Sequence, residues 1–268
     1  MKTRPRTRLP IVLTIAGSDS GGGAGIQADL KTFAALGVHG TTAVTCLTAQ
    51  NPKRVLRLQP CGSSFLGVQL TAVFAELPPD AVKTGMLHSV ENIRQVARVL
   101  SRGKRRPVIV DPVMVSTSGT PLLERKAVEC LRGELLPLAS LITPNLDEAT
   151  ALCGIPIRQP EDLRTAARLL HRKFRCAVLI KGGHLPHAKE ALDIFYDGKT
   201  ELLLSAPFIK GIRTHGTGCT YAAAIAAYCA LGFALPEAVT KAKMYLTQAI
   251  ARSQRVAGHD VLNHFWNS

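Results

Sequence analysis

The feature that most constrains the fold of this chain is a regular alternation of two sequence patterns. Short apolar runs rich in β-branched residues occur at 11–17, 41–50, 81–87, 107–114, 140–145 and 176–183. Helical periodicities lie between and after them, at 24–36, 63–76, 89–102, 122–136, 160–174, 217–231 and 236–255. Strands that alternate with helices form right-handed βαβ units, with parallel strands and helices on both faces of the sheet. The alternation therefore predicts an α/β fold with a mostly parallel central sheet.

Two late segments depart from this pattern. "ALDIFYDG" (191–198) and "TELLLSAPFI" (200–209) are spaced like an antiparallel hairpin, which we expect at an edge of the sheet. No repeat, low-complexity stretch or linker interrupts the series, and 268 residues suit one α/β domain. We predict a basic N-terminal tail over 1–10 and a single domain over 11–268.

Charge and composition exclude several classes of protein. With 46% apolar and 19% charged residues, the chain is globular and not disordered. The net charge of +14 indicates anionic partners, but no base-reading motif accompanies it, so we expect no nucleic acid. Solvated basic loops and the attraction of phosphorylated small molecules are sufficient explanations.

Cysteine usage and hydropathy bear on the compartment. The seven cysteines are scattered without a C-x-x-C pair, which argues against a disulfide framework or a zinc site and for a reducing compartment. No apolar run reaches about 18 residues, so no membrane span is expected. The basic start before "LPIVLTIAG" faintly resembles a signal peptide, but its apolar part is short and fits a first strand better. We expect a cytoplasmic protein.

Polar and glycine-rich segments follow the six apolar runs at the same end. They are "SDSGGGAG", "AQN", "TGM", "DPVM", "TPNLDE" and "KGGH". Ligands of open α/β sheets bind outside the carboxyl ends of the strands, so these segments predict one shared site. The triple glycine matches neither G-x-G-x-x-G nor a P-loop. For Asp29, which follows it, both a structural role and substrate contact remain open.

The stretch "GTGC" at 216–219 precedes an alanine-rich apolar helix. It places the amides of Thr217, Gly218 and Cys219 in a first turn, where they lack intrahelical partners and can bind an anion. A thiol there is expected to have a lowered pKa and to accept a proton. The alternative is a buried structural cysteine.

These segments together carry a family resemblance. "TIAGSDSGGGAGIQADLKT", "TAQN", "KTGML", "VDPVM", "LITPNLDEA", "IKGGH" and "THGTGCT" resemble the hydroxymethylpyrimidine/phosphomethylpyrimidine kinases of thiamine biosynthesis, in the ribokinase-like superfamily. The resemblance runs from Leu13 to about Ala257. Most superfamily relatives with other substrates have an aspartate at the position of Cys219.

The resemblance implies a reaction and a substrate pocket. The family uses ATP and Mg²⁺ to phosphorylate 4-amino-5-hydroxymethyl-2-methylpyrimidine, and then phosphorylates the monophosphate to the pyrophosphate. Gln50 matches the amide that recognises the ring edge, with both donor and acceptor. The remaining pocket wall is matched by Ala24, Asp29, Met86 and Val113.

The resemblance also implies a nucleotide side. Asn145 and Glu148 match a motif that organises Mg²⁺, and Asp111 joins its water network. Lys181 and Thr214 match positions near the nucleotide. Gly216, Thr217, Gly218 and Cys219 form the anion hole, with Cys219 as the proposed base.

Two other functions remain open. A pyridoxal or pyridoxine kinase on the same fold shares "GTGC" and also acts on a hydroxymethyl heteroaromatic ring. A non-catalytic ligand- or nucleic-acid-binding protein derived from a kinase is disfavoured by the intact set Asp111, Asn145, Glu148, Lys181 and Cys219. A homodimer is also left open.

Overall fold

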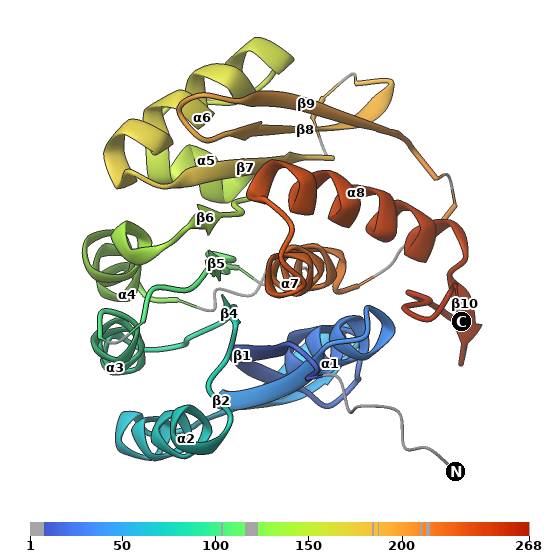
Figure 1. The fold of residues 1–268 in the computed structure, drawn as a ribbon. Helices are drawn as coiled ribbons and strands as arrows, with labels where there is room; N and C mark the ends of the chain where they lie inside the picture. The colour runs from blue at the N-terminus through green and yellow to red at the C-terminus, as the bar shows by residue number, and fades with distance from the viewer. Residues whose placement is uncertain are drawn as a thin grey trace, which may run out of the picture.

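The computed structural model describes residues 8–102, 104–115, 123–183, 185–186, 188–209, 211–212 and 215–267. Within them, a nine-stranded sheet has the order β3-β2-β1-β4-β5-β6-β7-β8-β9 (Figure 1). Its strands are β1 (Ile11–Asp19), β2 (His39–Asn51), β3 (Arg54–Pro60), β4 (Ala81–Thr84), β5 (Val108–Val110), β6 (Leu141–Ile142), β7 (Ala177–Gly182), β8 (Glu190–Tyr196) and β9 (Glu201–Pro207). The six central strands, in the order β2-β1-β4-β5-β6-β7, pair in parallel. Strand β3 pairs antiparallel with β2, β8 with β7, and β9 with β8. The predicted parallel sheet and edge hairpin are confirmed.

The strand order reverses beside β1. The chain passes from β1 to β2 on one side and then continues from β4 to β9 on the other. A reversal of this kind opens a crevice at the carboxyl ends of the two strands that flank it, here β1 and β4. The topology therefore places a ligand site where "SDSGGGAG" and "TGM" leave the sheet.

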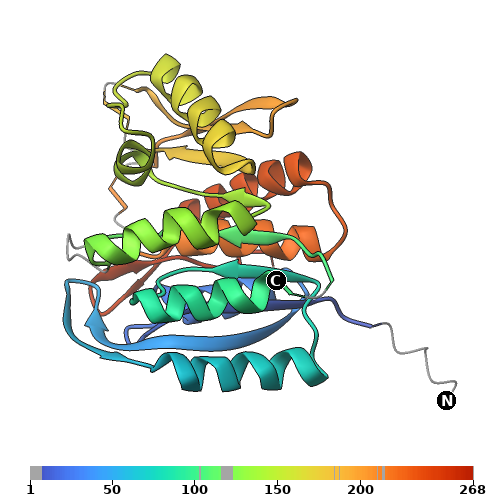
Figure 2. The ribbon, with the colours of Figure 1, turned by 90° about the vertical axis from the view of Figure 1, so that its left-hand side faces the viewer.

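Helices cover both faces of the sheet, and each face has its own apolar core (Figures 1 and 2). One face carries α2 (Ser63–Glu76), α3 (Val90–Leu100), α4 (Arg125–Cys130), α5 (Leu146–Cys153) and α6 (Pro160–Phe174). The other carries α1 (Gly25–Ala35), α7 (Thr217–Ala230) and α8 (Leu235–Ala251). Leu66, Ile93 and Leu163 are fully buried on the first face, and Phe33, Ile225 and Val239 on the second.

Helix α7 is an interior helix. Its residues from Ala222 to Ala227 are completely buried, because alanine side chains let the backbone approach the sheet, α1 and α8 closely. Its first turn is also enclosed, since a Cβ on Gly216 would collide with the Gly23 carbonyl. This turn, "GTGC", lies at the carboxyl ends of β1, β5 and β7, beside Gly23, Asp111 and Lys181.

Several predicted boundaries were wrong. The helix expected over 122–136 is α4, followed by a π-helical turn at Leu131–Leu135 and a 3₁₀ turn at Leu136–Leu138, where Pro137 cannot continue an α-helix. The strand expected over 140–145 shortens to β6, and α5 was not expected. The helix expected over 236–255 ends at Ala251, and a small antiparallel pair follows, β10 (Gln254–Val256) and β11 (His259–Val261).

Strand β3 was also missed. It pairs antiparallel with β2 and forms the opposite edge of the sheet from the predicted hairpin. Arg54 and Arg57 interrupt its apolar pattern, as charged residues on edge strands commonly do. The turn before it had a recognisable sequence, Asn51-Pro52, and the side chain of Asn51 accepts hydrogen bonds from the amides of Lys53 and Arg54.

In the described part of the chain, no helix combines the length and apolar character that a membrane span requires.

Candidate active site

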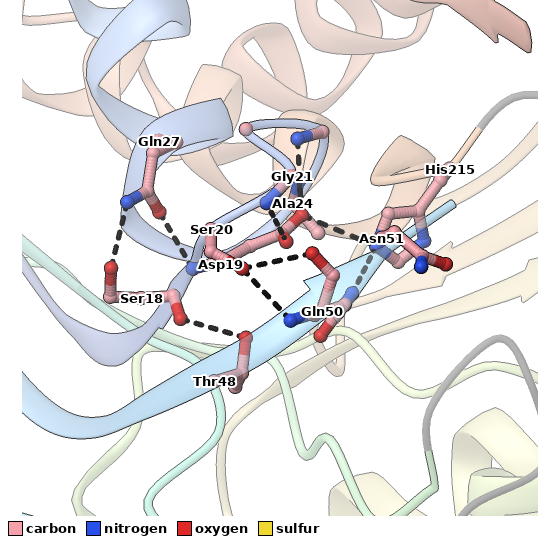
Figure 3. Close-up of polar contacts among 12 residues, drawn as sticks. Ser18, Asp19, Ser20, Gly21, Ala24, Gln27, Thr48, Gln50, Asn51 and His215 are labelled. Atoms are coloured by element: carbon pink, nitrogen blue, oxygen red, sulfur yellow. Dashed lines mark hydrogen bonds and ion pairs between the residues drawn. The ribbon is translucent and has the colours of Figure 1, made fainter. Parts of the chain in front are cut away.

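A buried carboxylate organises the glycine-rich loop after β1 (Figure 3). Asp19 Oδ1 accepts a hydrogen bond from the Gly21 amide at 2.8 Å, and Oδ2 accepts from Gly23 at 3.0 Å and Ala24 at 2.8 Å. Burial acts to raise the pKa of Asp19, but the contact with His215 and the loop amides outweigh it, so the pKa is lowered. The loop therefore closes around a charged carboxylate.

The same loop is attached to the end of β2. Ser20 Oγ donates to the Gln50 carbonyl at 2.9 Å and accepts from the Gln50 amide at 2.8 Å (Figure 3). The Gln27 side chain accepts from the Asp19 amide and donates to Ser18 Oγ, which fixes the loop to α1. The backbone of Gln50, the predicted recognition residue, is thus held beside the glycine loop.

The N-terminal turn of α7 packs directly against this loop. Gly216 is the N-cap with φ of 84°, and a Cβ placed on it would lie 1.8 Å from the Gly23 carbonyl oxygen. The Thr220 amide donates to the Gly216 carbonyl and closes the first turn. The three amides that precede this bond, those of Thr217, Gly218 and Cys219, are the ones an anion can use.

The expectation of a lowered pKa for Cys219 was wrong. Burial raises the pKa of this thiol to about 11, and the nearby carboxylates of Asp29 and Asp111 add to the increase. Lys83 and the Gly25 amide lower it by less. The sequence showed a helix N-terminus, but the fold adds buried negative charge beside it. At neutral pH Cys219 is a thiol.

Asp29 and Lys83 form an ion pair beneath the site. Lys83 Nζ donates to Asp29 Oδ2 at 2.8 Å, both side chains are fully buried, and Thr14 Oγ1 donates to the same oxygen at 2.6 Å. Burial acts to lower the pKa of Lys83, but the carboxylate of Asp29 outweighs it and raises the pKa. Asp29 lies beyond the first turn of α1, and its Oδ1 has no hydrogen-bond partner among the described residues.

A second cluster borders the same α7 turn. Lys181 Nζ donates to Asp111 Oδ1 at 2.7 Å, and Thr143 Oγ1 donates to the same oxygen at 3.0 Å. A Cβ on Gly218 would lie 3.2 Å from Lys181 Nζ and 3.7 Å from Asp111 Oδ2. The lysine and the carboxylate therefore border the first turn of α7.

Asn145 and Glu148 form a capping box at the start of α5. Asn145 Oδ1 accepts from the Glu148 amide at 2.9 Å, and Glu148 Oε2 accepts from the Asn145 amide at 2.8 Å. Burial and the charge of Asp111 raise the pKa of Glu148 to about 7, while Lys181 opposes them. Asn145 is also bridged to Lys181 across adjacent strands, which brings the pair to the second cluster.

The residues of this cluster fit a hydrated Mg²⁺ better than an ion caged by protein. The described residues contain no group of three or more His, Cys, Asp or Glu side chains that could hold a metal. Mg²⁺ usually keeps several waters and uses one or two carboxylates together with phosphate oxygens. Asp111 Oδ2, which takes no hydrogen bond from the described residues, and Glu148 can supply such contacts.

Three of the remaining predicted site residues have described positions, and one does not. Met86 and Val113 pack together in a small apolar cluster with Cys46 and Leu58. Ala24 is buried against the α7 turn, since its Cα lies 3.2 Å from a Cβ placed on Gly216. Thr214 lies outside the described residues.

Three residues of the site were not predicted. Asp19 and His215 flank motifs that were recognised, since "SDSGGG" has an acid before its glycines and "HGTGC" a histidine before its turn. Lys83 interrupts the apolar strand "AVKTGML", and a lysine in a buried strand indicates a charged partner. Attention to these three signals would have found them.

Taken together, the reversal point of the parallel sheet, the helix amides and the lysine–carboxylate cluster are the fold and site of a small-molecule kinase. A family model described as phosphomethylpyrimidine kinase matches residues 19–263. The chain belongs to the phosphomethylpyrimidine kinase family.

Individual relatives agree with this assignment. The thiamine biosynthesis bifunctional protein ThiED of Geobacter sulfurreducens is 50% identical over 254 residues, which are 94% of this chain and 52% of that protein. The chain thus spans about half the length of that relative. The hydroxymethylpyrimidine/phosphomethylpyrimidine kinase of Synechococcus elongatus is 47% identical over 96% of this chain and 98% of its own.

A solved structure shows the same fold. The Bacillus subtilis pyridoxal kinase, in complex with ADP, superimposes with a TM-score of 0.88 at 38% identity, covering 96% of this chain and 98% of the other. The ribokinase-like expectation is confirmed.

Proposed function

We propose that the chain uses ATP to phosphorylate the hydroxymethyl group of 4-amino-5-hydroxymethyl-2-methylpyrimidine, and then to phosphorylate the monophosphate to the pyrophosphate. The observation that carries this proposal is the position of the α7 turn. The turn borders the glycine loop, which is attached to Gln50, through Gly216 and the Lys181–Asp111 pair through Gly218. A phosphoryl group at this turn would face an acceptor beside the glycine loop and a nucleotide beside the Lys181–Asp111 pair.

The acceptor side recognises a flat polar ring. The Gln50 amide offers one acceptor and two N–H donors, which match the amino group and ring nitrogen of an aminopyrimidine. Met86 and Val113 supply apolar surface for the ring and its methyl group. Asp29 stays a predicted contact, through the Oδ1 atom that lacks a partner.

The transfer itself depends on positioning and on stabilisation of charge. The amides of Thr217, Gly218 and Cys219 would bind the oxygens of the migrating group, and Lys181 would offset their negative charge. Mg²⁺, when bound with the nucleotide beside Asp111 and Glu148, would neutralise further phosphate charge. Asn145 holds Glu148 in place through the capping box.

Cys219 would accept the hydroxymethyl proton or position that hydroxyl. Its pKa of about 11 makes the resting group a thiol, which can position the hydroxyl but cannot take its proton, so only the small thiolate fraction can act as the base. Lys83, whose charge acts to lower the pKa of this thiol, would stabilise the thiolate that accepts the proton.

An ADP-release assay tests the function directly. The pyrimidine alcohol, its monophosphate and pyridoxal are offered separately with Mg²⁺ and ATP, and we expect turnover of the first two. The fold similarity to a pyridoxal kinase makes pyridoxal the second candidate. Turnover of pyridoxal alone would favour that candidate, and no turnover of any of the three would overturn the kinase proposal.

We also propose a cytoplasmic location. All seven cysteines are free, and several are buried, as expected for a protein that works in a reducing compartment.

A further inference from the structure

One ring nitrogen of His215 has two polar neighbours (Figure 3). His215 Nε2 lies 2.7 Å from the side-chain nitrogen of Gln50 and 3.6 Å from Asp19 Oδ2. The imidazole also packs on the glycine loop, because a Cβ on Gly23 would lie 3.3 Å from His215 Cδ2. His215 therefore joins the loop that follows β1, the end of β2 and the turn that starts α7.

The contact with Gln50 has a direction. An amide nitrogen donates hydrogen bonds and does not accept them, so this placement of the Gln50 amide requires the His215 tautomer with its proton on Nδ1 and an accepting Nε2. The backbone of Gln50 is fixed by Ser20, and only the orientation of its amide is left to be set. With Nε2 held by the imidazole, Gln50 Oε1 takes no hydrogen bond from the described residues and can serve a ligand.

We propose that His215 is a positioning residue that fixes the orientation of the Gln50 amide and so selects a 4-amino over a 4-oxo pyrimidine. This inference rests on the proposed function. Gln50 then presents Oε1 and its second N–H side by side, an acceptor next to a donor. The 4-amino group and the adjacent ring nitrogen of an aminopyrimidine are complementary to that pair. A 4-oxo ring carries a carbonyl and a ring N–H there, which is the reverse pattern.

The opposite amide orientation would reverse the selection. A donor at the position of His215 Nε2 would attract Gln50 Oε1 and turn the N–H groups toward the ligand. Asp19 lies close enough to hold such a donor, since its Oδ2 is 3.6 Å from the ring nitrogen. Selection of the 4-amino ring therefore depends on a hydrogen-bond acceptor at the position of His215 Nε2. A polar side chain that only donates would not select this ring.

A matched pair of variants distinguishes the direction of the hydrogen bond to Gln50 from the packing of the side chain at position 215. His215→Met and His215→Lys have unbranched side chains of similar length, but Met offers no strong hydrogen bond and Lys only donates. The readout is the ratio of kcat/KM for the 4-amino pyrimidine alcohol to that for its 4-oxo counterpart. We expect His215→Met to raise KM for the amino alcohol and lower the ratio about 10-fold, the loss of one hydrogen bond to a ligand. His215→Lys should lower the ratio further, toward preference for the oxo ring.

The KM for ATP serves as the internal control and should stay within about twofold, because Gln50 and His215 lie on the acceptor side. If His215→Met also loses ATP binding, His215→Leu replaces it, with the same expected fall, because leucine likewise offers no hydrogen bond. In a Gln50→Leu background, His215→Met should cause no further change, since its effect passes through Gln50.

The outcomes distinguish this inference from the proposed function. An unchanged ratio in His215→Met, or equal ratios in the Met and Lys variants, would overturn the role of His215 while leaving the kinase intact. Absence of turnover by the unmodified chain would instead overturn the proposed function itself.

Discussion

At the scale of single residues, the Cys219 thiol is the group whose chemistry depends most on its surroundings. Because its pKa is about 11, the thiolate fraction increases about 10-fold for each unit by which the pH rises, as long as the pH stays below that value. If Cys219 is the proton acceptor, kcat should increase with pH across the neutral and mildly alkaline range. Cys219→Ala should abolish this increase and lower kcat about 10²–10⁴-fold, while binding of both substrates survives.

Cys219→Asp is the matched control, because aspartate also accepts a proton and should retain more activity than alanine. The measurement is kcat against pH for the three proteins with saturating substrates. Turnover of the alanine variant within about threefold of the parent would mean that the helix amides alone carry the catalysis.

Gln50 is the second residue with a direct test. Gln50→Leu keeps the approximate volume and removes the amide, so polar atoms of the bound ring are left unpaired at a cost of about 1–3 kcal/mol. KM for the pyrimidine should rise about 10-fold or more, with little change for ATP. Gln95→Leu makes the same change on α3, where the amide accepts from Arg98, and should affect neither constant. Equal losses for pyrimidine and ATP in Gln50→Leu would indicate damage to the fold.

At the scale of elements, α7 has a left-handed glycine at each end. Gly216 has φ of 84° and Gly232 has φ of 93°, so alanine is strained at both, by about 1–2 kcal/mol. The two glycines differ in the space around them. A Cβ on Gly216 would collide with the Gly23 carbonyl, whereas a Cβ on Gly232 would have no atom within 4 Å. Gly216→Ala must therefore displace the turn that we propose binds the phosphoryl group, and Gly232→Ala need not.

We expect Gly232→Ala to lower the free energy of unfolding by about 1–2 kcal/mol and to leave kcat unchanged. The Gly216→Ala variant should have a still lower free energy of unfolding. Its kcat should fall about 100-fold, because misplacing a reacting group by about 1 Å can cost that much. Thermal unfolding and steady-state kinetics of the two variants measure both effects. Similar kcat values would show that contact between the turn and the glycine loop is dispensable.

At the scale of the whole molecule, the C-terminal segment is bound to the active-site helix through a buried histidine. His264 Nε2 and Thr220 Oγ1 share a hydrogen bond of 3.0 Å, and Tyr245 donates to the His264 carbonyl at 2.7 Å. Burial, together with the charge of Lys31, lowers the pKa of His264 to about 4 from an ordinary value of 6.5. These contacts give the segment a structural role beside Cys219.

This shift predicts how stability changes with pH. Between pH 6.5 and 4 the unfolded chain binds a proton at His264 and the folded chain does not, so stability falls as the pH falls through this window. The contribution is up to about 3 kcal/mol, by the usual 1.36 kcal/mol per pKa unit. His264→Gln keeps a polar partner for Thr220 and removes the titration, so its stability should fall less over the same window. Denaturant unfolding at pH 7, 5.5 and 4.5 compares the two, and parallel losses would contradict the assignment.

Much of the fold was predictable because it follows from local periodicity. The strands β1, β2, β4 and β7 and the helices α2, α3, α6 and α7 lie within or close to their predicted ranges. The failures have local causes too. Strand β3 is an edge strand with arginines in its pattern, and Pro137 divides a helical stretch. The Asn145-x-x-Glu148 motif was interpreted as a metal motif, although the same spacing is a capping box and predicts the start of α5.

The sequence by itself determined the class of fold, the edge of the sheet that carries the site and the family, because motif order and periodicity are properties of the chain. Only the tertiary structure decided the electrostatics and the contacts within the site. Cys219, Asp29 and Asp111 are far apart in the chain, and the burial and the carboxylates that raise the pKa of the thiol arise only when their elements pack together. His215 meets Gln50 across 165 positions of sequence, so the orientation of the recognition amide could not be inferred before the fold was known. Spacing in sequence specifies which groups a turn carries, and burial and proximity in space specify their protonation and their direction.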